Sequence, residues 1–289
     1  MTQKNIGIIG VGRMGLAMAR NLIVAGYEVT GYRRSGMDAF VAIGGIASGS
    51  PAEAVSKSDV VFTCLPDNHA LDDALTRDGG ILQALKPGQI VVETTSLTPA
   101  EKRAQAGVIA KVRGVMLDCP VSGTPGMLEA GRGAFFVSGD RAIADSINDV
   151  LETICPRTTW VGDIGAGAAT KSVATALVAI HNLAAAEGLA MAAREGGDIA
   201  AVYHAISGSP ASSAIFEMRG ALMAKRDYAA GGGSIEGYLR GLSRVHETAS
   251  PEGPTPLLDV TRAWYESAVD AGHTGQDQAC IFEYLMETE

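Results

Sequence analysis

The segment "NIGIIGVGRMG" near the start of the chain constrains the fold more than any other feature. It places Gly10, Gly12 and Gly15 in G-x-G-x-x-G spacing, directly after an apolar run and at the start of a helical pattern. The first glycine permits a tight turn, the second lets the backbone approach a pyrophosphate, and the third allows close helix packing. The free amides at the start of the helix then meet the phosphates. The segment therefore predicts a strand-turn-helix unit that binds a dinucleotide.

Strand-like runs and helix-length segments alternate through the first half of the chain, which predicts crossover connections and a largely parallel sheet. The runs are "NIGIIG", "YEVTGY", "DVVFTCL", "QIVVETT", "VMLDCP", "GAFFVSG" and "TTWVG". Two of the expected helices begin with an N-cap residue, a proline and then an acid. These are Ser50, Pro51 and Glu53, and Thr98, Pro99 and Glu101.

The composition changes after Gly162. Residues 163–195 form an Ala-rich run of strong helix formers, which we expect to be one long interdomain helix, apolar nearly all round and therefore buried. The remainder has helical periodicity and no convincing strand. We therefore predict an α/β Rossmann-type doubly wound sheet domain over residues 1–162. An all-helical domain for substrate binding and dimerisation follows over residues 163–289.

Bulk properties exclude several classes of protein. The formal charge of −9 and the lack of a basic run argue against nucleic-acid binding. The start of the chain has no secretory pattern, and no apolar run approaches a membrane span, so we expect a cytoplasmic protein without a membrane partner. The cysteines are too widely spaced to predict a metal or redox site: Cys64, Cys119, Cys155 and Cys280.

The second strand ends in "VTGYRRS", which places Arg33, Arg34 and Ser35 where an NAD-binding protein would carry an acid for the ribose hydroxyls. Two guanidinium groups there suit a 2′-phosphate, because they form charge-assisted hydrogen bonds that an acid would oppose. A solvated surface turn is the plainer explanation of paired arginines. Their place relative to the glycine turn favours NADP.

Polar residues follow two further strands. Glu93, Thr94, Thr95 and Ser96 come where an apolar strand ends, and we expect them at the ligand-binding rim of the sheet. In "DCPVSGTPGM", the segment Ser122–Thr124 offers two hydroxyls and the open amides of a glycine, which together can hold a carboxylate. On its own, this segment is better explained as an ordinary serine-glycine turn.

Lys171 is the only basic residue between Arg157 and Arg194 and lies in an otherwise apolar helical run. Loss of hydration would lower its pKa toward the range in which it exchanges protons at neutral pH. Thr175, four residues later, shares its helical face. A lysine that reaches solvent from the edge of a helix is the competing interpretation.

With these motifs on one chain, the sequence resembles the β-hydroxyacid dehydrogenase family over nearly its whole length. That family includes 3-hydroxyisobutyrate and tartronate semialdehyde enzymes and is related to the 6-phosphogluconate dehydrogenases. Its G-x-G-x-M-G signature is matched by Gly10, Gly12, Met14 and Gly15. Its D-x-P-V-S-G-G loop resembles Asp118–Gly123 followed by Thr124, and "GAGAATK" resembles the approach to the catalytic lysine.

The resemblance implies hydride transfer between NADP(H), preferred over NAD(H), and a small β-hydroxyacid. Lys171 would be the general acid and base. Ser122, Gly123 and Thr124 would bind the carboxylate, and Thr175 would lie near the hydroxyl. The implied cofactor-binding residues are Gly10, Gly12, Arg13, Met14, Gly15, Arg33, Arg34, Ser35, Leu65, Pro66, Thr95 and Arg240. Dimers through the helical domain are usual in the family, so we expect a homodimer or homotetramer.

Two departures from the family pattern leave the substrate open. Thr175 stands where the family usually has Asn, and "GYLRGL" places Arg240 and Gly241 where a Lys-Asp pair is expected. Imine reduction on the same fold is the enzymatic alternative, although Lys171 favours alcohol and carbonyl chemistry. Decarboxylation of a β-keto product ranks lower. An NADP(H)-binding sensor with little turnover is the alternative from another class.

Overall fold

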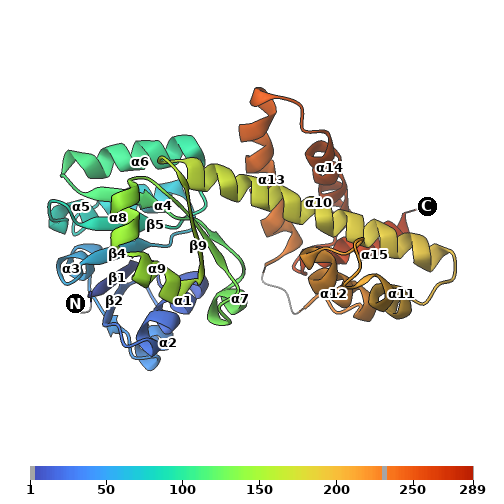
Figure 1. The fold of residues 1–289 in the computed structure, drawn as a ribbon, viewed down its shortest axis with the longest axis horizontal. Helices are drawn as coiled ribbons and strands as arrows, with labels where there is room; N and C mark the ends of the chain where they lie inside the picture. The colour runs from blue at the N-terminus through green and yellow to red at the C-terminus, as the bar shows by residue number, and fades with distance from the viewer. Residues whose placement is uncertain (1–3, 230–232, 289) are drawn as a thin grey trace. The chain divides into compact units, whose positions relative to one another are not determined.

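The structure is a computed structural model that describes residues 4–229 and 233–288 (Figure 1). The chain divides into two compact units, one ending at Lys171 and the other beginning at Ser172. The first unit is built on a sheet and the second on helices.

The first unit contains a nine-stranded sheet in the order β3-β2-β1-β4-β5-β6-β8-β7, with β9 beside β8. All neighbours from β3 to β6 are parallel, and the order 3-2-1-4-5-6 is that of a doubly wound dinucleotide-binding fold. The strands are β1 Ile6–Ile9, β2 Val29–Tyr32, β3 Ile46–Ala47, β4 Val60–Thr63, β5 Ile90–Glu93, β6 Val115–Asp118, β7 Val121–Ser122, β8 Ala134–Ser138 and β9 Arg157–Gly162. The expected α/β fold class is therefore confirmed.

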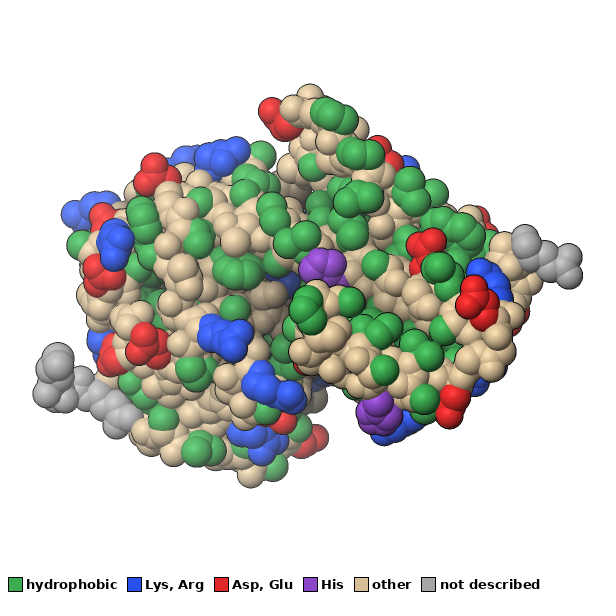
Figure 2. Space-filling model, turned by 45° about the vertical axis from the view of Figure 1, so that its right-hand side comes forward, with side chains coloured by type: hydrophobic (Ala, Val, Ile, Leu, Met, Phe, Trp, Pro, Cys, Tyr) green, Lys and Arg blue, Asp and Glu red, His purple; other side chains and the backbone are tan. Residues whose placement is uncertain are grey.

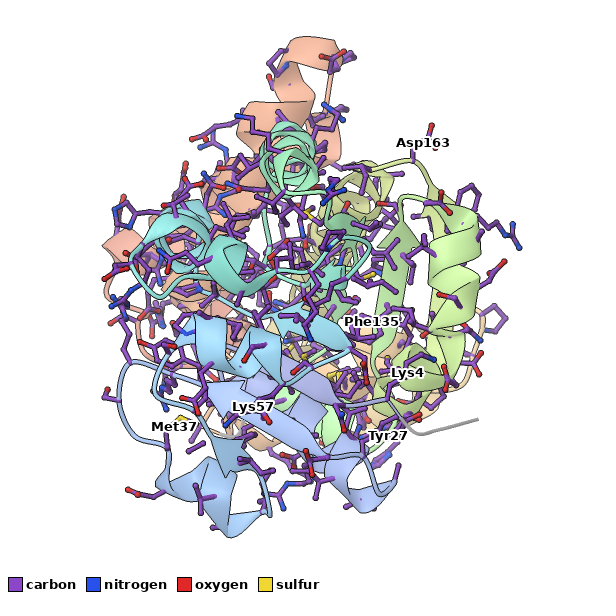
Figure 3. All side chains as sticks on the ribbon, turned by 90° about the vertical axis from the view of Figure 1, so that its left-hand side faces the viewer. Lys4, Tyr27, Met37, Lys57, Phe135 and Asp163 are labelled. Atoms are coloured by element: carbon purple, nitrogen blue, oxygen red, sulfur yellow. The ribbon has the colours of Figure 1, made fainter. Side chains whose placement is uncertain are left out.

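The sheet is buried on both faces because apolar side chains of successive strand residues point to opposite sides. Ile8 and Phe62 belong to one core, and Ile9 and Val61 to the other. Phe135 of β8 is fully buried (Figure 3). The helices of this unit are α1 Arg13–Val24, α2 Asp38–Ala42, α3 Pro51–Ser56, α4 Asn68–Thr76, α5 Ile81–Ala84, α6 Pro99–Lys111, α7 Pro125–Glu129, α8 Arg141–Ser146 and α9 Asn148–Ile154.

Both helix starts expected from the sequence are present. The Ser50 hydroxyl accepts a hydrogen bond from the Glu53 amide at 3.1 Å and caps α3. At α6 the Thr98 hydroxyl accepts from the Glu101 amide at 3.2 Å, and the Glu101 carboxylate accepts from the Thr98 amide at 2.7 Å. This reciprocal pair satisfies amides that have no partner within the helix.

The second unit is helical, and its described residues form no β-strand. Its core includes Leu189, Tyr265 and Phe282. Its helices are the continuation of α10 (Ala166–Arg194), then α11 Ile199–Ile206, a π-helical turn Phe216–Gly220, α12 Ala221–Lys225, α13 Ile235–Ala249, α14 Pro256–Asp270 and α15 Ile281–Glu287. Short 3₁₀ turns at Ser250–Glu252 and Gln278–Cys280 precede α14 and α15.

The long helix α10 differs from expectation in two ways. It is buried on one side only, since Val173, Leu177 and Met191 are 59%, 47% and 58% exposed. Apolar side chains are visible at the molecular surface in Figure 2. By length and composition α10 is also the one described helix that could cross a membrane, so the expectation that no segment qualifies was wrong. Ala186 and Leu189 of this helix pack in a protein core, as in a soluble core helix.

Candidate active site

A cavity of about 530 Å³ opens at the carboxyl ends of β1, β2 and β4. Strand order reverses between β1 and β4, because the chain leaves β1 toward β2 and later returns to β4 on the other side. Doubly wound folds bind ligands at such a switch point, outside the carboxyl ends of the strands. The cavity therefore lies where the glycine turn predicts a dinucleotide.

The three glycines of the turn have different surroundings. A Cβ atom on Gly10 would lie 2.2 Å from the Cys64 carbonyl oxygen, and one on Gly15 would lie 2.2 Å from the Gly10 carbonyl oxygen. Gly10 also has a φ of +105°, which favours glycine. A Cβ on Gly12 would meet no described atom within 4 Å, so the backbone there borders open space.

This geometry fits a pyrophosphate. Gly12 is the N-cap residue of α1 and lines the cavity, but it has no side chain to bind the first helical amides. Those amides and the positive end of the helix remain available to an anion. Arg13, Met14 and Gly15 form the first turn of α1, and none of the three lines the cavity.

The end of β2 brings Arg33, Arg34 and Ser35 to the cavity wall, where all three are exposed. The structure adds Arg77 and His69, which flank the cavity from α4 and its end and which sequence reasoning missed. Arg77 forms an ion pair with Asp73 at 3.6 Å. These residues lie far from the glycine motif in the chain, so only the sheet order brings them to the cavity.

Leu65 and Pro66 line the cavity beside Cys64. Cys64 is a half-buried free thiol, and burial raises its pKa to about 11. The Thr95 hydroxyl accepts a hydrogen bond from the Leu65 amide at 3.2 Å and so lies one contact behind the cavity wall. The Thr94 hydroxyl donates to the Thr63 carbonyl at 2.7 Å. The polar end of β5 therefore holds the end of β4 in place.

The segment Ser122–Thr124 connects β7 to α7. Gly123 has a φ of +143°, and the Thr124 hydroxyl accepts a hydrogen bond from the Met127 amide at 3.3 Å as the N-cap of α7. Ser122 and Thr124 are half-buried. The turn thus has a defined backbone conformation and retains two hydroxyl groups that can donate hydrogen bonds.

Lys171 lies in the second turn of α10 and is half-buried. Burial lowers its pKa to about 8, so both the ammonium and the neutral amine are populated near neutral pH. Thr175 and Arg240 belong to the second unit: the Thr175 carbonyl accepts a hydrogen bond from the Tyr238 hydroxyl at 2.7 Å, and Arg240 is exposed on α13. Their roles stay predictions.

The sheet order, the glycine turn and the cavity together define a dinucleotide-binding α/β protein. Residues 5–162 match the family model described as the NAD binding domain of 6-phosphogluconate dehydrogenase. Residues 165–285 match the model described as NAD-binding of NADP-dependent 3-hydroxyisobutyrate dehydrogenase. The chain belongs to the β-hydroxyacid dehydrogenase family, as its sequence motifs indicated.

Two relatives illustrate the similarity. An L-threonate dehydrogenase of Cupriavidus necator is 31% identical over 290 residues, which cover 99% of this chain and 97% of the relative. A 2-hydroxy-3-oxopropionate reductase of Escherichia coli is 30% identical over 224 residues, 77% of each chain. The protein is an NAD(P)-dependent dehydrogenase or reductase that acts on CH–OH groups, and the family acts on small hydroxyacids.

Solved structures extend the comparison. A 3-hydroxyisobutyrate dehydrogenase from Salmonella typhimurium has a TM-score of 0.85 at 26% identity and covers 97% of this chain and 99% of that one. An imine reductase from Myxococcus stipitatus has a TM-score of 0.68 at 22% identity, covering 98% of this chain and 100% of that one. The second likeness concerns the fold alone.

Proposed function

We propose that the protein is an NADP-dependent oxidoreductase that interconverts a small β-hydroxyacid and its semialdehyde or keto acid by hydride transfer. The observation that carries the proposal is Lys171, a half-buried lysine with a pKa of about 8 in a hydroxyacid dehydrogenase chain. A group that titrates near the working pH is suited to both accept and return a proton.

The preference for NADP rests on the charges at the cavity. The cavity lining includes three arginines and a serine: Arg33, Arg34, Arg77 and Ser35. The guanidinium groups can form charge-assisted hydrogen bonds to the 2′-phosphate of NADP, which the ribose hydroxyls of NAD cannot form. Gly10, Gly12, Arg13, Met14 and Gly15 form the phosphate-binding turn in this proposal. Leu65, Pro66, Thr95 and Arg240 complete the cofactor contacts.

The protein residues handle binding and the proton, while the nicotinamide cofactor supplies the hydride chemistry. The Ser122 and Thr124 hydroxyls and the Gly123 backbone bind the substrate carboxylate. Lys171 Nζ removes the hydroxyl proton during oxidation and returns it during reduction. Thr175 hydrogen-bonds the same hydroxyl. Residues 1–162 bind the cofactor in this scheme, and residues 163–289 complete the substrate site.

The proposed assembly is a cytoplasmic homodimer or homotetramer. Val173, Leu177 and Met191 of α10 are apolar and more than two-fifths exposed, and burying such side chains stabilises association. Light scattering coupled to size exclusion measures the mass directly. A monomer at micromolar concentration would contradict this part of the proposal.

The first experiment follows NADPH oxidation, with NADH in parallel, against a panel of small semialdehydes and keto acids. We expect NADPH-preferring turnover that is lost in Lys171→Ala, while the variant still binds NADPH. Turnover of cyclic imines alone would establish imine reduction, which the shared fold allows. Tight NADPH binding without turnover of the semialdehydes, the keto acids or the cyclic imines would favour a sensor.

A further inference from the structure

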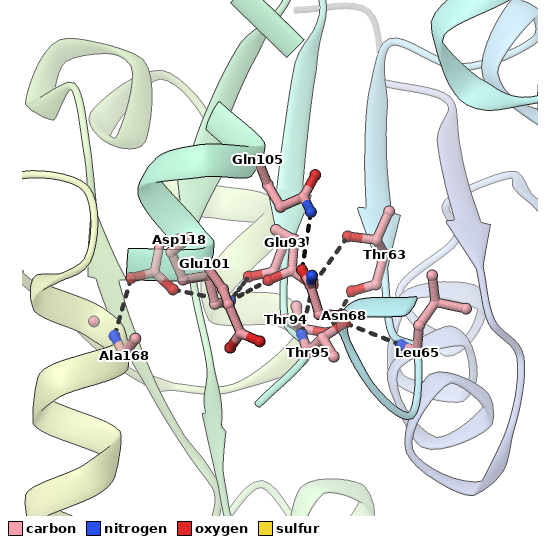
Figure 4. Close-up of polar contacts among 12 residues, drawn as sticks. Thr63, Leu65, Asn68, Glu93, Thr94, Thr95, Glu101, Gln105, Asp118 and Ala168 are labelled. Atoms are coloured by element: carbon pink, nitrogen blue, oxygen red, sulfur yellow. Dashed lines mark hydrogen bonds and ion pairs between the residues drawn. The ribbon is translucent and has the colours of Figure 1, made fainter. Parts of the chain in front are cut away.

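A buried cluster of charged side chains lies in the first unit, at the ends of β5 and β6 (Figure 4). Glu93 ends β5, Asp118 ends β6, and Lys102 reaches both from α6; all three are 0% exposed. The Lys102 ammonium pairs with the Glu93 carboxylate, lies 3.0 Å from Asp118 Oδ1, and donates to the Glu93 carbonyl at 3.1 Å. None of these side chains lines the cavity.

Burial alone would lower the pKa of Lys102, but the attraction of Glu93 and Asp118 outweighs burial and raises it. The lysine therefore stays charged. One ammonium faces two carboxylates, which leaves one negative charge in surplus. An uncompensated buried charge costs several kcal/mol, so a further positive partner is needed.

The start of α10 supplies that partner. Asp118 Oδ2 accepts hydrogen bonds from the Ala168 amide at 2.9 Å and from the Ser138 hydroxyl at 3.0 Å. The Ser138 hydroxyl in turn accepts from the Gly167 amide at 3.0 Å. Gly167 and Ala168 are the second and third residues of α10, whose amides have no carbonyl partner within the helix. The helix is therefore capped by side chains from two strands, and its positive end meets the surplus negative charge.

The first turn of α10 packs closely against the strands that carry Asp118 and Ser138. A Cβ atom on Gly167 would lie 2.5 Å from the Phe136 carbonyl oxygen and 3.0 Å from Asp118 Oδ2. The first turn of α10 thus has little freedom to shift along or across the sheet.

Lys171 follows Ala168 by three residues, which places the two about 4.5 Å apart along the helix axis and on neighbouring positions of one face. The contact that holds the Ala168 amide therefore also sets the position from which the Lys171 side chain extends. At the other end of the cluster, Glu93 Oε1 accepts from the Thr95 amide at 2.8 Å, and Thr95 accepts from the Leu65 amide at the cavity wall. One network connects the cavity wall with the helix that carries Lys171.

We propose that Asp118, held by Lys102 and Glu93, is a positioning residue that fixes Lys171 relative to the cofactor cavity. The proposal rests on the proposed function, since it assumes that Lys171 exchanges the substrate proton. Asp118 acts through the first turn of α10 and touches neither substrate nor cofactor. Displacement of a reacting group by about 1 Å can reduce a rate by about 100-fold, so such a clamp has a large effect on turnover.

The test variant is Asp118→Asn in the full-length protein. The amide keeps the size of the side chain, removes the surplus charge, and leaves Lys102 paired one to one with Glu93. The matched control is Gln105→Met, which perturbs the same helix α6 near Lys102. Gln105 is buried and donates to Asn68 at 2.9 Å and to Asp72 at 2.6 Å, away from α10.

The first readout needs no turnover. Lysines are methylated with a ¹³C label, the Lys171 resonance is assigned by its absence in Lys171→Arg, and its titration is followed by NMR. Because burial lowers the pKa of Lys171, a loosened helix start that admits water should raise the midpoint. We expect a rise of about half a pH unit or more in Asp118→Asn and no change in Gln105→Met.

The second readout is kinetic, with the carbonyl substrate that turns over best in the panel and NADPH. We expect kcat to fall about 10- to 100-fold in Asp118→Asn, while KM for NADPH stays within about twofold. An unchanged Lys171 midpoint, or equal losses in Gln105→Met, would overturn the proposal. If Asp118→Asn does not fold, Ser138→Ala replaces it, because it removes the hydroxyl that donates to Asp118 and accepts from the Gly167 amide. It keeps Asp118 itself and should give the same changes at smaller size.

The two readouts separate this proposal from the proposed function. Full turnover in Lys171→Ala would show that Lys171 is not the acid and base, whatever the NMR midpoints are. If Lys171→Ala loses turnover but the Lys171 titration midpoint does not move in Asp118→Asn, only the positioning role of Asp118 is rejected.

Discussion

The cofactor cavity and the charged cluster at the start of α10 both lie at the carboxyl ends of strands but are constructed differently. The cavity depends on backbone: Gly10 and Gly15 allow close contacts, and Gly12 leaves open space. The cluster depends on side chains from four elements, in which Lys102, Glu93, Asp118 and Ser138 satisfy one another and the start of α10. The glycine turn of the cavity is local in the chain, whereas the charged cluster joins residues that are distant in sequence. Mutations should therefore affect the two differently.

The largest effect, a loss of turnover, is expected from substitution of Lys171, the proposed acid and base. Lys171→Ala should reduce kcat about 1,000-fold, because a positioned acid or base contributes about 10²- to 10⁴-fold to a rate. Binding of NADPH should change little, since Lys171 does not line the cavity. Steady-state kinetics and a fluorescence titration of NADPH measure the two quantities. A comparable loss of NADPH affinity would show that the cavity and the lysine are not separable.

The glycines provide a sharper comparison within the cavity. Gly10→Ala should lower the free energy of unfolding by about 2–4 kcal/mol, because the new Cβ meets the Cys64 carbonyl and the residue has a positive φ. Gly12→Ala should fold normally but bind NADPH at least about tenfold more weakly, since its methyl group projects into open space. Urea denaturation and NADPH titration distinguish the two, and similar stability losses in both variants would contradict the comparison.

Cofactor choice should depend on the cavity alone. Arg33→Ala combined with Arg34→Ala should raise Kd for NADPH by about 10- to 100-fold, because charge-assisted bonds to the 2′-phosphate are worth about 1.5–3 kcal/mol. Affinity for NADH should remain within about twofold. Calorimetry at two salt concentrations measures both. Arg77→Ala tests the third cation, and equal weakening of NADPH and NADH would refute selection by the 2′-phosphate.

Proton exchange at Lys171 should produce opposite pH profiles for the two reaction directions. Its pKa of about 8 means that the neutral amine, the base needed for oxidation, increases as pH rises through about 8. The ammonium, the acid needed for reduction, decreases over the same range. Plots of kcat/KM against pH in each direction test this, and parallel profiles would assign the titration to another group.

The smallest effect concerns stability. A lysine whose pKa is lowered by folding binds its proton less tightly when folded than when unfolded, so it destabilises the folded state below about pH 8. The penalty disappears between about pH 8 and 10.5 as both states lose the proton. Lys171→Met should therefore raise the free energy of unfolding at pH 7 by about 1–2 kcal/mol, with no gain above pH 10.5. Denaturant curves at pH 7 and 10.5 provide the test.

Features that depend on neighbouring residues were predictable from the sequence, and features that depend on distant residues were not. The glycine turn, the seven apolar strands and the caps at Ser50 and Thr98 were predictable because each depends on neighbouring residues. The two-residue strands β3 and β7 were missed because so short a segment has no period. Arg77 joins the cavity only through the order of the strands, and no local pattern indicates it.

Side-chain networks and exposed faces were harder to predict. Lys102 lies in a helix sequence, Pro99–Lys111, that gives no sign of a buried lysine. Its complete burial follows only from the meeting of β5, β6 and α6. The apolar composition of α10 suggested burial on all sides, but composition does not determine which side packs within one chain. Glu93, Thr94 and Thr95 were predicted at the ligand-binding rim, but no local pattern indicated that Thr94 and Thr95 also connect β5 to the end of β4.

The thiol at the cavity wall has a practical consequence for handling the protein. Because burial raises its pKa to about 11, the Cys64 side chain is almost entirely a neutral thiol at pH 7, and thiolates are the form that reacts with alkylating agents and peroxides. Cys119, Cys155 and Cys280 are buried as well. The protein should therefore retain NADPH binding through mild oxidation and maleimide treatment. Fluorescent labels can be attached at engineered surface cysteines without first removing the natural ones.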